Sequence, residues 1–158
     1  MQEIIEIILL TLTPFLELRA SIPYGIIIQQ MDAFFVFLLC VITNILLAPV
    51  LYVFLDKFVH IFFYFKPIEK LYHKHVEITQ KKIHKYIEKY GWVGVAIFIG
   101  IPLPGSGVYS GALGSYVLGL SFKKFMLAAA VGVLIAGIIV TIISVLGVNG
   151  LDIFIKLV

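Results

Sequence analysis

Two long runs without a charged residue constrain this chain more than any other feature. Residues 33–55 and 125–148 are 23 and 24 residues long, and neither contains Asp, Glu, Lys or Arg. At about 1.5 Å per helical residue, each run is long enough to cross the ~30 Å hydrocarbon core of a bilayer. The chain is 61% hydrophobic and 13% charged, which is more apolar surface than a soluble domain of this size buries. We therefore predict an all-α integral membrane protein in which each run forms a transmembrane helix.

Each of these runs follows an apolar stretch that is broken near its middle. The arms are residues 4–15 and 22–30 in the first half, and 91–101 and 108–122 in the second. Glu17 and Arg19 interrupt the first stretch, and the prolines and glycines of residues 102–107 interrupt the second. Pro and Gly at that density end a helix, and each arm as a helix spans roughly half a bilayer. Each stretch is either one kinked span, which gives four crossings, or a re-entrant hairpin that returns to its starting side.

The distribution of positive charge favours the hairpins. Residues 56–89 contain eight of the twelve basic residues. If both broken stretches are hairpins, Lys123 and Lys124 lie on the same side as this segment, so ten of the twelve basic residues share one face. Cytoplasmic loops of membrane proteins carry such an excess of Lys and Arg, whereas four crossings would move the two lysines to the outside. We therefore place the segment in the cytoplasm and both termini outside.

The predicted architecture is one membrane domain with internal symmetry. A repeat with an odd number of crossings recurs in inverted orientation, and inverted repeats with broken helices are a common plan of secondary transporters. In the segment between the halves, apolar residues recur at helical spacing among lysines, which predicts a basic amphipathic helix on the cytoplasmic surface; a solvated connector is the alternative. The single domain, residues 1–158, comprises repeat one at 1–55, the linker at 56–90 and inverted repeat two at 91–158.

Glu17 and Arg19 are the first candidates for a functional site. Each ionisable residue at the bilayer centre costs about 2.5–3.5 kcal/mol on insertion scales, so such residues usually serve a function. Two residues apart, they would point to different sides of a continuous helix, but in a loop they can converge on one cavity. The alternative is an ion pair that only fixes the loop.

Helix termini are expected to complete an anion site beside these charges. Ser21 and Pro23 suit the first residues of a helix, whose N-terminal amides would then point at the membrane midplane next to Arg19. In the second break, Gly105, Ser106 and Gly107 can bring backbone N–H groups close to a ligand, with Val108 beginning the next helix. The two breaks together predict one midplane site.

Several other residues have structural interpretations. We expect Asn44 either to line the cavity or, preferably, to bond across helices, and Pro49 to interrupt the first span. The small residues at regular spacing predict close helix packing. They form two stripes, one of Gly107, Gly111, Ser115 and Gly119 and one of Ala128, Gly132 and Ala136.

The sequence lacks the residue patterns that metal binding, catalysis or nucleic-acid binding would require. His73 and His75 have no cysteine or acid to complete a metal site. No nucleophile–base pair and no phosphate-binding Gly-Lys motif is present, so we expect neither an enzyme nor a cofactor or metal. A net charge of +3 does not indicate a nucleic-acid partner.

The two breaks resemble a known pair of signatures. The segments 17–25 (ELRASIPYG) and 101–107 (IPLPGSG) resemble those of the small multidrug export family of prokaryotic membrane proteins, over nearly the whole chain. That family is similar to the DedA/VTT superfamily, whose members have facing re-entrant loops in inverted repeats and are associated with lipid movement, including polyprenyl-phosphate carriers, with proton coupling. The resemblance implies a multi-pass protein of the prokaryotic plasma membrane.

The resemblance also implies roles for individual residues. Glu17 would be the acidic coupling residue and Arg19 the base that contacts the headgroup. The loops would be shaped by Ser21 and Pro23 in the first and by Pro102, Pro104, Gly105, Ser106 and Gly107 in the second. DedA proteins carry basic residues in the second loop as well, whereas residues 101–107 contain none, so a phosphate would meet one arginine.

Three functions follow as hypotheses. The first is a transporter of an anionic lipid or polyprenyl phosphate, with a proton exchanged at Glu17 and the headgroup held by Arg19. The second is a proton-coupled exporter of small cationic or amphipathic drugs, and the third is a structural membrane protein without transport. The expected partners are a membrane lipid or amphipathic small molecule and protons. The small number of helices predicts a homodimer.

Overall fold

The computed structural model of the chain describes residues 1–62, 91–103 and 105–156, and this part is helical without strands. The elements are α1 (Gln2–Leu12), α2 (Glu17–Pro23), the π-helix η1 (Tyr24–Ile28), α3 (Ala33–Phe62), a helix over Gly91–Gly100, α5 (Val108–Val117) and α6 (Phe122–Lys156). The predicted amphipathic helix of the linker lies outside the described residues beyond residue 62, as does Pro104.

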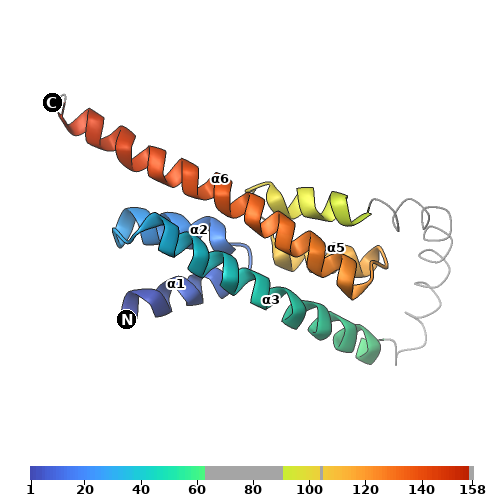
Figure 1. Cartoon of the computed structure of the whole chain (residues 1–158). Coiled ribbons are helices and arrows are strands. Elements are labelled where there is room, and N and C mark those ends of the chain that lie inside the picture. Colours follow the sequence, from blue (N-terminus) through green and yellow to red (C-terminus); the bar gives the residue numbers. More distant parts are fainter. Residues whose placement is uncertain (63–90, 104, 157–158) are drawn as a thin grey trace.

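The two predicted spans are each found as one continuous helix. The apolar portions Ala33–Lys57 of α3 and Phe122–Gly147 of α6 are 25 and 26 residues long, with mean hydropathies of 2.6 and 2.8. They lie side by side and run in opposite directions through the molecule (Figure 1). A Cβ atom on Gly137 of α6 would lie 2.9 Å from the side chains of Phe37 and Val41, so a glycine is required where these helices touch.

Pro49 lies inside α3, and the helix continues through it, so the expected interruption of this span is wrong. A proline removes one N–H from the helix ladder, but such a loss is tolerated in membrane helices, where neighbouring groups satisfy the freed carbonyl. A single proline therefore does not end a helix in this part of the chain.

Both broken stretches double back on themselves (Figure 1). The chain enters the molecule along α1 from the end that holds both termini, reverses, and returns along α2 and η1. The helix Gly91–Gly100 enters from the opposite end and returns along α5. The turns of the two hairpins meet in the middle of the molecule, where the candidate site lies.

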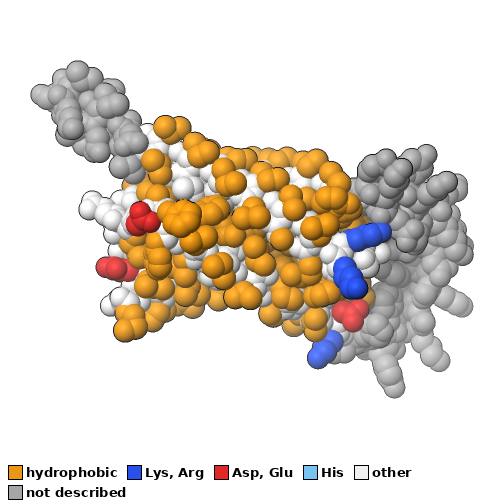
Figure 2. All heavy atoms as spheres, in the orientation of Figure 1, with side chains coloured by type: hydrophobic (Ala, Val, Ile, Leu, Met, Phe, Trp, Pro, Cys, Tyr) orange, Lys and Arg blue, Asp and Glu red, His pale blue; other side chains and the backbone are white. Residues whose placement is uncertain are grey.

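The face of the described molecule that Figure 2 shows is apolar around its middle and charged at its ends. Ile42 and Leu46 of α3 and Ile142 of α6 are more than half exposed, as expected for side chains that face lipid. Exposed lysines, Lys57 and Lys123, lie where α3 leaves the apolar body and α6 enters it.

The predicted packing of small residues is confirmed within the second hairpin and where this hairpin meets α6. A Cβ atom on Gly132 of α6 would lie 2.7 Å from the carbonyl oxygen of Ala96, and one on Gly111 of α5 would lie 2.5 Å from the side chain of Ile99. Real Cβ atoms do not approach so closely, so Gly132 allows α6 to touch the backbone of the helix Gly91–Gly100, and Gly111 makes room for the side chain of Ile99.

Asn44 of α3 does not bond across helices as expected. Its side chain is fully buried, and neither its amide nitrogen nor its oxygen has a hydrogen-bond partner among the described residues. A buried amide without a partner is costly, so Asn44 is a position where the helix packing leaves a polar group unsatisfied.

Candidate functional site

The first break is a short segment with an unusual backbone. Phe15 and Glu17 have positive φ angles of 70° and 47°, a conformation that costs a non-glycine residue about 1–3 kcal/mol. The helix α2 begins at Glu17, with Leu16 as its N-cap. Strain of this size persists only where surrounding contacts hold it, and Glu17 has such contacts.

The expected helix start at Ser21 is therefore wrong by four residues. The Ser21 hydroxyl does not cap a helix; it donates to the carbonyl oxygen of Glu17, one turn earlier, at 3.1 Å. Pro23 lies at the end of α2 instead of in its first turn. Because Pro23 has no N–H, the α-helical pattern of backbone hydrogen bonds ends there, and the π-helix η1 follows.

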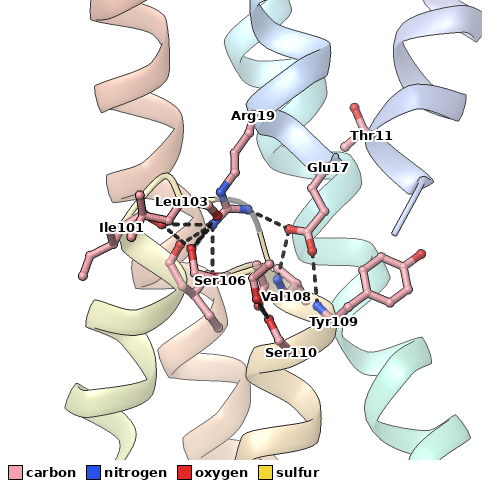
Figure 3. Close-up of polar contacts among 12 residues, drawn as sticks. Thr11, Glu17, Arg19, Ile101, Leu103, Ser106, Val108, Tyr109 and Ser110 are labelled. Atoms are coloured by element: carbon pink, nitrogen blue, oxygen red, sulfur yellow. Dashed lines mark hydrogen bonds and ion pairs between the residues drawn. The ribbon is translucent and has the colours of Figure 1, made fainter. Parts of the chain in front are cut away.

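The carboxylate of Glu17 occupies the N-terminus of α5 (Figure 3). It is 2% exposed and accepts hydrogen bonds from the backbone N–H groups of Val108 at 3.0 Å and Tyr109 at 3.3 Å. A negative charge at a helix N-terminus satisfies amides that have no partner within the helix and interacts favourably with the helix dipole.

Gly107 allows this approach. It is the N-cap of α5, and Val108 begins the helix as predicted. A Cβ atom at position 107 would overlap both carboxylate oxygens of Glu17. The predicted close approach to the Gly107 backbone is thus found, but the anion that approaches is the protein's own carboxylate.

Arg19 binds the opposite end of the second break. Its Nη1 donates to Glu17 at 3.3 Å. Its Nη2 lies 3.1 and 3.2 Å from the carbonyl oxygens of Ile99 and Ile101, where the helix Gly91–Gly100 ends. A cation is favourable beside the unsatisfied carbonyls of a helix C-terminus.

The same guanidinium nitrogen also reaches the loop. Nη2 of Arg19 lies 3.0 Å from the carbonyl oxygen and 3.2 Å from the hydroxyl oxygen of Ser106. The Ser106 hydroxyl in turn lies 2.6 and 2.8 Å from the carbonyls of Ile101 and Leu103. Nε of Arg19 is buried without a partner among the described residues. The two charges of the first hairpin therefore satisfy both helix ends of the second.

A second polar cluster lies within the first hairpin. The hydroxyl of Thr11 donates to that of Ser21 at 2.7 Å, and Ser21 lies 3.2 Å from the sulfur of Cys40. All three side chains are fully buried and join α1, α2 and α3. Ser21 thus positions the backbone at Glu17 but does not face the carboxylate.

The structure divides the predicted site residues into groups. Glu17, Arg19, Ser106 and Gly107 come together in one network of contacts. The remaining residues are placed elsewhere: Gly105, with a left-handed φ of 82°, and Pro102 lie in the second loop, Ser21 and Pro23 lie in α2, and Pro104 is outside the described residues.

Sequence reasoning missed the groups that bind the two charges. The amide of Tyr109 and the carbonyls of Ile99 and Ile101 belong to the backbone, and backbone groups leave no signal in the sequence. The hydroxyl of Tyr109 also donates to the carbonyl of Leu12 at the end of α1, which joins the hairpins a second time. A tyrosine in the first turn after the Gly-Ser-Gly break was the available signal.

The arrangement is that of an anion site that already contains an anion. Every group that donates to the Glu17 carboxylate is an N–H group, two from a helix N-terminus and one from a guanidinium. These are also the donors that bind phosphate groups in proteins. Among the described residues, no group of His, Cys, Asp or Glu is arranged to hold a metal ion.

The chain matches a known protein family over most of its length. A family model described as "Putative small multi-drug export protein" matches residues 17–139, from the first charged residue of the site to the middle of α6. No curated protein and no solved structure gives a significant match.

Proposed function

Since this chain belongs to the small multi-drug export family, we propose that it is a membrane transporter whose substrate is an anionic lipid of the polyprenyl-phosphate class, moved with a proton. The family description supports membrane export in general. The observation that supports an anionic substrate is the position of the Glu17 carboxylate, held by the amides of Val108 and Tyr109 and by Arg19.

The carboxylate of Glu17 acts in this proposal as an internal competitor of the substrate. A phosphate headgroup and a carboxylate use the same N–H donors, so they cannot occupy the N-terminus of α5 together. While Glu17 is ionised, the site is closed to an anion by its own charge. The headgroup enters when the carboxylate leaves.

Protonation of Glu17 provides the release. A neutral carboxyl group is a weaker acceptor for the amides of α5 and no longer attracts Arg19. The freed donors then favour a phosphate, so proton binding and anion binding support each other. Deprotonation on the other side of the membrane restores the Glu17 contacts and expels the headgroup, which couples anion movement to proton movement in the same direction.

The hairpins supply the framework for this exchange. We propose that both are re-entrant, with their turns at mid-depth in the membrane, and that the two halves form an inverted repeat, since the turns meet in the middle of the molecule from opposite ends (Figure 1). Irregular backbone at that depth is tolerated where protein buries it. The lysines at one end support a cytoplasmic location of the linker and external termini in a prokaryotic plasma membrane. A homodimer would complete the enclosure of the pathway.

Translocation of a fluorescent polyprenyl phosphate in proteoliposomes tests the proposal. Arg19→Gln should lower the rate by at least about tenfold, since each hydrogen bond to a charged group contributes about 1.5–3 kcal/mol. Glu17→Gln should retain translocation but lose its dependence on an imposed proton gradient, because the amide cannot exchange a proton. Glu3→Gln and Lys123→Gln remove exposed charges at the two ends and are the matched controls. Absence of protein-dependent movement, or full activity of Arg19→Gln, would refute it.

Export of cationic drugs is the second candidate, because the family description names multi-drug export. A cation would bind Glu17 in place of Arg19. In a drug-resistance assay, Glu17→Gln should then abolish resistance while Arg19→Gln has a mild effect, which is the reverse of the order expected for an anionic substrate. If neither substitution affects either assay, the pair serves only to hold the hairpins together.

A further inference from the structure

An apolar groove runs between the two arms of the second hairpin. It has a volume of about 350 Å³ and is open on one side. Phe98 and Leu118 contribute to its walls, and Gly94 and Gly114 also line it, one from each arm. Its size falls within the range of about 300–1,000 Å³ typical of small-molecule sites.

The packing of the chain does not account for the glycines of this groove. Among the residues that the structure describes, none has an atom within 4 Å of a Cβ atom added to Gly94 or Gly114. The neighbouring Gly111 differs, because a Cβ atom there would overlap the side chain of Ile99. Glycine destabilises a helix relative to alanine, so Gly94 and Gly114 maintain open space where the fold itself would accept a larger residue.

One end of the groove adjoins the charged site. Ser110 lines the groove, and its hydroxyl contacts the carbonyl oxygens of Gly105 and Gly107 in the second loop. Val108 and Tyr109, the two residues before Ser110, supply the backbone amides that bind the carboxylate of Glu17. A molecule that lay in the groove would therefore reach the loop that separates it from the Glu17 and Arg19 contacts.

We propose that this groove holds the hydrocarbon chain of the transported lipid while its headgroup occupies the site of Glu17 and Arg19. The assignment rests on the proposed function. The lining is almost wholly apolar, so water has few partners there, whereas an alkyl or isoprenyl chain fits the lining and can enter through the open side. The charged site lies across the second loop from Ser110 and fits the other part of the same amphiphile.

Leucine substitutions fill the groove without disturbing the fold. Gly94→Leu and Gly114→Leu place a side chain in open space, and each replaces glycine with a better helix former. Gly147→Leu is the matched control, because Gly147 also lies in a helix and no described residue has an atom within 4 Å of an added Cβ, but it is on α6 and does not line the groove. Helicity and elution volume in detergent confirm that each variant is folded.

The probe is a polyprenyl phosphate with a photoactivatable diazirine in its chain, added to the full-length protein in phosphatidylcholine vesicles. We expect saturable labelling of the peptides around residues 91–98 and 110–118. Gly94→Leu and Gly114→Leu should reduce this labelling by at least about tenfold, since even one methylene in an apolar pocket changes binding by about 10–200-fold. Gly147→Leu should leave it unchanged.

Three results would overturn the proposal. Labelling of these peptides could persist in both leucine variants, or a neutral diazirine lipid could label them equally well, which would show ordinary bilayer contact. The leucine variants could instead abolish cross-linking between copies of the chain without changing the labelling, which would make the groove a dimer interface. Labelling does not require transport, so the two proposals can fail separately. Saturable labelling without translocation would refute only the proposed function. Translocation without labelling would refute the groove as the site of the hydrocarbon chain.

Discussion

Replacing Gly107 with alanine tests the central contact of the site. The backbone of Gly107 has φ −89° and ψ −162°, which alanine can also adopt. The obstacle is the side chain alone, because the added methyl group would overlap the carboxylate of Glu17. The substitution therefore acts on this one contact and not on the conformation of the loop.

The expected cost follows from the hydrogen bonds that are lost. Glu17 must withdraw from the amides of Val108 and Tyr109, and each hydrogen bond to a charged group contributes about 1.5–3 kcal/mol. Losing both should lower the free energy of unfolding by about 3–6 kcal/mol. In a Glu17→Ala background the space is vacant, so Gly107→Ala should cost less than about 1 kcal/mol, the usual difference between glycine and alanine at an N-cap.

The assay is unfolding by titration with sodium dodecyl sulfate in mixed micelles, followed by circular dichroism. The wild type, both single variants and the double variant form a cycle whose coupling energy should be at least about 2 kcal/mol. Gly114→Ala, on the same helix but in open space, is the control and should be neutral or slightly stabilising. Equal costs of Gly107→Ala in both backgrounds, or no cost in the wild type, would refute the reasoning.

Three further substitutions test other parts of the structure in the same unfolding assay. Asn44→Leu should raise stability by about 1–3 kcal/mol, because it removes a buried amide without a partner; a decrease would mean that the amide is hydrogen-bonded in the membrane. Gly132→Ala should cost about 1–3 kcal/mol through overlap with the backbone of Ala96, and Gly147→Ala should cost nothing. Phe15→Gly should relieve a left-handed φ at a side chain that is 72% exposed, for a gain of up to about 1 kcal/mol, whereas a loss would show that the ring is needed for packing.

The position of the site was predictable because the bilayer imposes strong rules on sequence. Glu17 and Arg19 are conspicuous where each charge is costly, and the prolines and glycines of residues 102–107 mark the second break. Gly107 and Val108 were correctly assigned to the start of a helix. The family expected from these motifs is confirmed, while the more distant resemblance to the DedA/VTT superfamily stays a prediction.

The local details were less predictable. Serine is a residue type typical of N-caps, but the hydroxyl of Ser21 contacts the carbonyl oxygen of Glu17 within α2 and the side chains of Thr11 and Cys40. Proline is a residue type that usually ends a helix, yet α3 continues through Pro49. At Ser21, contacts with neighbouring helices overrode an N-cap preference of about 0.5–2 kcal/mol, and at Pro49 the helix continues in spite of the missing N–H.

The sequence by itself determined that this chain lies in a membrane. It also determined which residues form the two long helices and which residues interrupt the shorter ones. The reason is that the thickness of the hydrocarbon core and the cost of burying a charge constrain the residue type at each position along the chain. Only the tertiary structure decided what the charges bind. Glu17 meets the amide of Val108 across 91 positions of sequence, and Arg19 meets the carbonyl of Ile99 across 80. From the sequence, Arg19 and a helix N-terminus appeared free to receive an anion. In the folded chain the amides of Val108 and Tyr109 and both terminal nitrogens of Arg19 already have partners, because buried polar groups without water find most of their partners within the protein.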